Sequence, residues 1–205
     1  MNTKDRPYLV SVVSFVVSAI GNSGMTNESD RRLLLKIARD AVVAHVSGAA
    51  LATIEPMALD GRRGAAFVTL HKRSGELRGC IGHLEPDQFL PDVVAQCAVA
   101  ACSADPRFPP VAPTELADLE IELSLIGPLE PIAGADEIEI GRHGLVIEQG
   151  WRRGLLLPQV ATEWKWDRQR FLAQTCRKAG LPQDAWKQGA TIWRFEAEVF
   201  GEDSE

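Results

Sequence analysis

The chain has 205 residues and a formal net charge of −6, with 45% hydrophobic and 24% charged residues. These proportions are ordinary for a globular protein, and they exclude a collagen, a disulfide miniprotein, a coiled coil and a mostly disordered chain. A domain of this length buries about 70% of the surface that its unfolded chain exposes, so its core needs no disulfide or metal.

The first 24 residues contain an apolar run from Tyr8 to Ile20. This run is shorter than the roughly 20 apolar residues of a membrane-spanning helix, and it resembles the hydrophobic region of a signal peptide. A signal or anchor, an integral element and a mis-called gene start are the alternatives. We favour the last, because Met25 precedes a typical helix opening. We therefore expect an extension at residues 1–24, a domain at 25–201, an acidic tail at 202–205 and no membrane partner.

The domain itself is acidic. Residues 1–24 include Lys4, Asp5 and Arg6, so the remainder of the chain has a net charge of −7. Its arginine pairs are isolated from one another. An acidic domain without a basic run is a poor candidate for binding nucleic acid, and we expect no such partner.

The first predicted element is a helix in which apolar residues from Leu33 to His45 recur at helical spacing. Thr26 or Asn27 can cap its start, and Gly48 is a plausible terminator. Since His45 continues the apolar stripe, we expect it to be packed rather than to bind a ligand.

A hairpin and a second helix follow. The pattern predicts strands over residues 66–71 and 76–82, joined by a turn at 73–75. A helix is predicted over residues 91–103, because proline suits its first turn and Asp-Pro disfavours its continuation. Alternating apolar and polar residues over 119–125 indicate a half-exposed strand.

The last third of the sequence mixes the same elements. The GRHG segment at 141–144 is predicted to be a loop, followed by strands at 145–148 and 155–157. Asp167 is a predicted helix cap, and a final strand is expected over 193–199. Because hairpins dominate and helices are interspersed, we predict an α+β fold with a mainly antiparallel sheet.

Three of the four cysteines fall on apolar helical faces, namely Cys97, Cys102 and Cys176. Free cysteine behaves there as a small hydrophobic residue. Cys97 and Cys102 are also poorly spaced on one helix for a mutual disulfide. The pattern fits a reducing cytosol, so we expect a cytoplasmic protein.

Cys80 differs, because it lies in the glycine-flanked segment LRGCIG. Gly79 and Gly82 would allow another backbone or a ligand to approach closely. Arg78 points to the same side of the strand as Cys80 and could favour a thiolate. Cys80 is therefore either a reactive thiol at the floor of a pocket or a buried cysteine in a tight sheet bend.

His143 is the best candidate base or cationic partner for such a thiolate, because it sits in a loop bounded by glycines. Cys80 and His83 have the spacing of half a metal site, but no second pair of ligands exists, so we expect no metal. The sequence contains no nucleotide-binding or metalloprotease motif, and we expect no built-in cofactor.

A polar and aromatic loop is formed by Asp105, Arg107 and Phe108 among prolines. Such a rigid loop could line a pocket or could be a well-packed turn. Glu163 follows the 155–157 strand, and it is either a surface residue of a helix or a weaker candidate for a pocket carboxylate.

Several segments of the chain form a recognisable combination. In chain order they are LRGCIG at 77–82, DPRFPP at 105–110, GRHGLVI at 141–147, LLPQVATEWKWD at 156–167, FLAQTCRKAGL at 171–181 and RFEAEVF at 194–200. Together these segments resemble the AMMECR family, in the form found in bacterial AmmeMemoRadiSam systems. LRGCIG matches without departure, whereas His83 replaces the small polar residue that often follows it.

The resemblance implies an α+β fold with a larger and a smaller part around a cleft, between which the chain crosses. It also implies two protein partners, a Memo-type protein and a radical SAM protein. No settled reaction comes with the family. Two functional hypotheses follow: an enzyme component centred on Cys80, or an adaptor module that binds a partner, a peptide or a small molecule.

Overall fold

The computed structural model describes residues 26–51, 54–55 and 58–202. The predicted extension at 1–24 lies outside the described residues, as do residues 203–205 of the predicted tail. None of the helices in the described part of the chain is long and apolar enough to cross a membrane.

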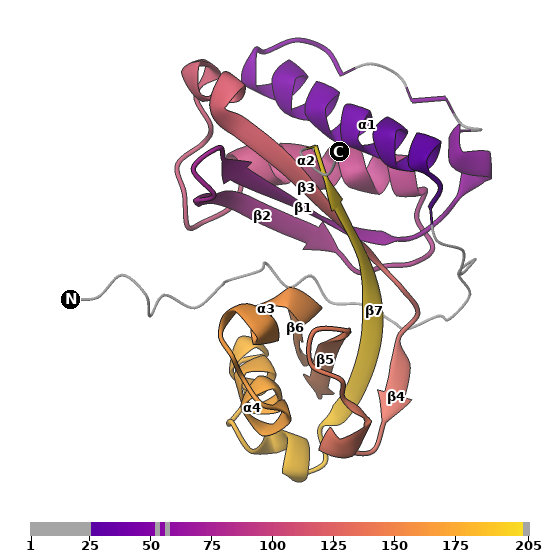
Figure 1. Cartoon of the computed structure of the whole chain (residues 1–205), viewed down its shortest axis with the longest axis vertical. Coiled ribbons are helices and arrows are strands. Elements are labelled where there is room, and N and C mark those ends of the chain that lie inside the picture. The colour runs from indigo at the N-terminus through magenta and orange to yellow at the C-terminus, as the bar shows by residue number, and fades with distance from the viewer. Residues whose placement is uncertain (1–25, 52–53, 56–57, 203–205) are drawn as a thin grey trace. The chain divides into compact units, whose positions relative to one another are not determined.

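The chain divides into two compact units (Figure 1). The smaller unit is Pro128–Ala197, and the larger unit comprises the described residues up to Gly127 together with those from Glu198 onward. The larger unit is therefore discontinuous in sequence, because the chain leaves it after Gly127 and returns to it at Glu198.

The helices of the larger unit are α1 (Glu28–Val46) and α2 (Leu90–Ser103), with short 3-10 helices η2 (Ala58–Gly61) and η3 (Pro113–Asp118). Its strands are β1 (Ala65–Lys72), β2 (Leu77–His83) and β3 (Leu119–Ile126). β1 pairs antiparallel with both β2 and β3, and in this register Thr69 lies opposite Cys80 on one side and Glu122 on the other.

The predicted signals for the first helix are largely confirmed. The Asn27 side chain caps α1 by accepting a hydrogen bond from the Asp30 amide, and the chain turns at Gly48 with a φ of 68°. His45, however, is exposed. The expectation that it packs into the core was wrong, because the buried stripe of α1 runs through Leu34, Ala38, Ala41 and Val42 instead.

The core of the larger unit lies between its helices and its sheet. α2 packs against β1 and β2, while α1 packs against α2 and β3. Alternate residues of β3, from Leu119 to Leu125, face this core, as the period-2 pattern predicts. The opposite sheet face carries Cys80, Thr69 and Glu122.

The smaller unit contains the remaining elements. They are β4 (Glu130–Ile132), η4 (Ala135–Glu137), β5 (His143–Gln149), β6 (Arg152–Leu156), α3 (Pro158–Glu163), α4 (Arg168–Lys178), η5 (Ala185–Lys187) and β7 (Thr191–Gly201). β5 pairs antiparallel with β6 and β7, and β4 pairs antiparallel with β7. α4 packs against β5 and β6. The α+β fold with an antiparallel sheet is thus confirmed.

Two details differ from the sequence pattern. His143 and Gly144 belong to β5 rather than to a loop, and β4 has no clear signal in the sequence. Gly144 is needed in this strand because a Cβ atom there would lie 2.3 Å from Cζ of Phe195 on β7. The glycine that indicates a loop in the sequence is therefore explained by close packing between strands.

Candidate functional site

Cys80 lies on β2 with its thiol partly exposed, whereas the other three cysteines are buried. All four are free. The Thr69 hydroxyl, on the neighbouring strand, donates a hydrogen bond to Sγ of Cys80 at 3.3 Å. A donor directed at sulfur stabilises a thiolate more than a thiol.

The backbone of Cys80 is held by the DPRFPP loop. Its amide donates to Oδ2 of Asp105 at 2.9 Å, and its carbonyl oxygen accepts from Nη2 of Arg107 at 3.5 Å. Arg107 also donates from Nε to Oδ1 of Asp105 at 2.9 Å. Since β2 is the outer strand of the sheet order, these side chains occupy the edge positions that a further strand would use.

Asp105 is charged in this setting although it is only 4% exposed. Burial by itself would raise the pKa of its carboxyl group. The hydrogen bonds from the Arg107 side chain and from the Cys80 and Arg107 amides outweigh that effect, and the pKa lies below its ordinary value.

Arg78 pairs with Glu115 rather than with the thiol of Cys80. It is buried, and its Nε and Nη2 atoms donate to the two carboxylate oxygens of Glu115 at 2.8 and 3.0 Å. Its Nη1 donates to the carbonyl oxygen of Pro109 at 3.0 Å. The Arg78 hydrogen bonds, followed by one from the Ala112 amide, lower the pKa of Glu115 to about 2. Arg78 thus ties β2 to the start of η3.

Phe108 joins the two arginine networks. The guanidinium carbons of Arg107 and Arg78 lie 5.3 and 5.9 Å from the centroid of its ring. These distances are within the range of cation–π attraction. The structure therefore brings together five of the predicted residues around β2, here called the Cys80 cluster: Arg78, Cys80, Asp105, Arg107 and Phe108.

The glycines of LRGCIG are explained by packing. A Cβ atom on Gly79 would lie 2.1 Å from the Ala101 carbonyl oxygen of α2. A Cβ atom on Gly82 would lie 2.1 Å from Cδ1 of Phe67, its cross-strand neighbour. The sequence left open whether these glycines let a ligand or another part of the protein approach. In the structure, the groups that lie close to them belong to the protein.

His143 and Glu163 belong to the smaller unit. Nδ1 of His143 accepts a hydrogen bond from the Glu139 amide at 3.0 Å. Burial, followed by the charges of Arg194 and Arg142, lowers the pKa of His143. The ring is therefore neutral at pH 7 and carries its proton on Nε2.

Glu163 is exposed at the end of α3, and its side chain has no hydrogen bond or ion pair among the described residues. Its surroundings match the surface-helix alternative rather than the pocket alternative. The contacts described for His143 and for Cys80 each lie within the unit to which that residue belongs.

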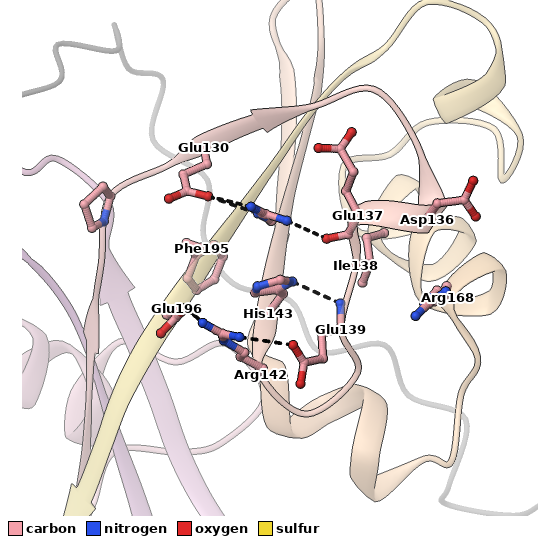
Figure 2. A pocket seen from close by; sticks show the side chains of 12 residues that line it. Glu130, Asp136, Glu137, Ile138, Glu139, Arg142, His143, Arg168, Phe195 and Glu196 are labelled. Carbon is pink, nitrogen blue, oxygen red and sulfur yellow. Dashed lines mark hydrogen bonds and ion pairs between the residues drawn. The ribbon is translucent and has the colours of Figure 1, made fainter.

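A cavity of about 590 Å³ lies in the smaller unit beside His143 (Figure 2). Its wall is charged and is built from β4, η4, the segment before β5, α4 and β7. The lining residues are Pro128, Glu130, Asp136, Glu137, Ile138, Glu139, Arg142, His143, Arg168, Arg194, Phe195 and Glu196. Apart from His143, sequence reasoning missed this set, although the acidic run directly before GRHG was an available signal.

Known proteins share this architecture. The AMMECR1 family model matches residues 35–200, a range that holds both the Cys80 cluster and the cavity. The chain belongs to the AMMECR1 family. A family relative from Methanothermobacter thermautotrophicus is 46% identical over 187 residues, covering 86% of this chain and 96% of that protein.

Other AMMECR1 relatives agree. A protein from Thermococcus gammatolerans is 44% identical over 183 residues, covering 83% of this chain and 89% of its own. The crystal structure of an uncharacterized protein from Pyrococcus horikoshii matches with a TM-score of 0.78 and 37% identity. That match covers 86% of this chain and 93% of the other, so both units of the AMMECR1 fold are included.

Proposed function

We propose that this AMMECR1 protein is an enzyme component in which Cys80 is the reacting thiol. The observation that carries the proposal is the contrast among the four cysteines. Cys80 alone is partly exposed, and its sulfur accepts the Thr69 hydrogen bond. Burial raises the pKa of Cys97 to about 12 and raises those of Cys102 and Cys176, which keeps these thiols protonated.

The residues around Cys80 have distinct roles in this proposal. The thiol loses its proton to water, and the thiolate attacks an electrophilic carbon to form a carbon–sulfur bond while the leaving group departs. Thr69 stabilises the thiolate. Asp105 and Arg107 position the strand through the Cys80 backbone. Arg78 is held by Glu115 and is assigned a structural role.

Alkylation of the folded protein tests the thiol. Iodoacetamide should modify one cysteine, Cys80, with formation of a carbon–sulfur bond and release of iodide. The label is located by peptide mass spectrometry. Cys80→Ser should abolish this labelling, whereas Cys176→Ser should not change it. Labelling of all four thiols only upon unfolding would overturn the proposal.

We further propose that the protein works in the cytoplasm with a Memo-type protein and a radical SAM protein, on a small molecule or peptide. The LRGCIG and DPRFPP resemblance supports the partners, and the four cysteines, none of them in a disulfide among the described residues, support the compartment. Incubation of the three proteins with cell metabolites, with wild-type chain or Cys80→Ser, should show consumption that depends on Cys80.

An adaptor module is the second candidate. The network of Asp105 and Arg107 on the Cys80 backbone favours it, because such a network serves the fold even without a reactive thiol. Under this alternative, Cys80→Ser keeps partner binding and cellular activity. Loss of activity at unchanged stability would exclude it and support the enzyme component.

A further inference from the structure

The cavity of the smaller unit is a candidate ligand site that is built from this unit alone. All of its lining residues fall within Pro128–Ala197, whereas Cys80 belongs to the larger unit. A volume of about 590 Å³ is within the range of small-molecule sites in proteins. Figure 2 shows His143 and the charged side chains that surround this space.

Two of the cavity arginines are already paired and form its frame. Arg142 makes ion pairs with Glu196 at 2.8 Å and Glu139 at 3.2 Å. Arg194 pairs with Glu130 at 3.0 Å and donates from Nη1 to the Glu137 carbonyl oxygen at 2.8 Å. These bonds link β4, η4 and the start of β5 to β7, so the wall is formed before any ligand binds.

Two further charged side chains on the cavity wall are not held in ion pairs within the described part of the chain. The side chains of Arg168, in the first turn of α4, and Asp136, in η4, have no hydrogen bond or ion pair with the residues that the structure describes. α4 and η4 pack against each other. One cationic and one anionic group are thus available to a ligand from two neighbouring elements.

His143 adds a neutral donor. It is only 7% exposed, and its Nδ1 is occupied by the Glu139 amide. The remaining ring nitrogen, Nε2, carries the proton and has no described hydrogen-bond partner. His143 lines the cavity, so this N–H group can donate to a ligand acceptor there in place of water.

The charge balance of the wall selects the ligand class. Five carboxylates face three guanidinium groups, so a simple anion meets a net negative wall. A simple cation would leave Arg168 and the Nε2–H of His143 without an acceptor. We propose that this cavity binds a small zwitterion of the amino-acid type. Its ammonium group pairs with Asp136, and its acceptor groups bind Arg168 and His143.

Calorimetric titration of the full chain with three probes tests the ligand class. L-lysine carries both kinds of group, 1,5-diaminopentane lacks the carboxylate, and hexanoate lacks the amines. We expect lysine to bind with a Kd on the order of 1 mM or tighter, and the other two at least about tenfold more weakly. No lysine binding at that level, or equal binding of either fragment, would overturn the proposal.

Substitutions locate the site. Arg168→Gln and Asp136→Asn should each weaken lysine binding about tenfold, because each removes one charge-assisted contact. Arg170→Gln is the matched control, since Arg170 is exposed in the same helical turn but does not line the cavity. An equal loss with Arg170→Gln would contradict the site. Cys80→Ser should leave lysine binding unchanged, so the cavity proposal and the proposal for the Cys80 thiol can each fail without the other.

Discussion

Thr69 faces Cys80 across the β1–β2 pair, and its hydroxyl donates to the cysteine sulfur. This contact is the local reason to expect a nucleophilic thiol at Cys80. Thr69 is buried, so the hydrogen bond is partly shielded from water. Arg78, which the sequence suggested for the same role, neutralises Glu115 instead.

Thr69→Val should slow alkylation of Cys80 about tenfold or more, because a hydrogen bond to a charged acceptor contributes about 1.5–3 kcal/mol and less thiolate forms without it. The rate constant for iodoacetamide at neutral pH measures this. Thr69→Ser keeps the hydroxyl and should retain most of the rate. Identical rates for Val and wild type would show that the hydroxyl does not activate the thiol.

Asp105 is the most consequential charge of the Cys80 cluster, because its side chain is 1% exposed and bonds both Arg107 and the Cys80 amide. Asp105→Ala should lower the free energy of unfolding by about 3–5 kcal/mol, since it removes the buried carboxylate of the ion pair with Arg107 and the hydrogen bond that this carboxylate accepts from the Cys80 amide. Urea unfolding measures the loss. Asp118→Asn, at an exposed position, is the control and should change little.

The same carboxylate gives a pH dependence with a definite sign. The folded-state pKa of Asp105 is lowered, so its contribution to stability is present above the unfolded value, about 3.9, and is lost as the pH falls through the folded pKa. The stability of wild type should therefore fall more steeply than that of Asp105→Ala below about pH 4. Parallel curves for the two proteins would contradict the assignment.

At the scale of elements, β2 is confined by its neighbours. Gly79 meets the backbone of α2, and Gly82 meets the Phe67 ring on β1. Gly79→Ala should destabilise the protein by about 1–3 kcal/mol or more, because the backbone oxygen of Ala101 cannot move away without shifting α2. Thermal unfolding measures this. Gly134→Ala, with an extended φ of −174° and open space around its Cβ position, should be nearly neutral.

The elements with strong local signals were predictable. The starts of α1 and α4 were predicted from their caps, Asn27 and Asp167. The bounds of β3 were predicted to within a residue from its alternation of apolar and polar residues. β4 was not predictable, because three residues including a proline carry no period of their own. Its pairing with β7 alone defines it as a strand.

At the scale of the molecule, the chain closes the larger unit with its last described residues. Glu198 accepts from the Thr26 amide at 3.0 Å and pairs with Arg31. Glu202, assigned to an acidic tail in the sequence, pairs with Arg39 and accepts from the Ile121 amide. Residues far apart in sequence thus complete one unit, while Pro128–Ala197 forms the other.

The sequence by itself determined the α+β class, the principal helices and strands, and the unusual position of Cys80 among four cysteines. These properties depend on local periodicity, capping and composition. Only the tertiary structure decided which charges meet. It assigned Arg78 to Glu115 and Asp105 to the Cys80 backbone, and it placed His143 in a charged cavity of the smaller unit. The physical reason is that ion pairs and cavities depend on the distances between segments, which no local pattern encodes.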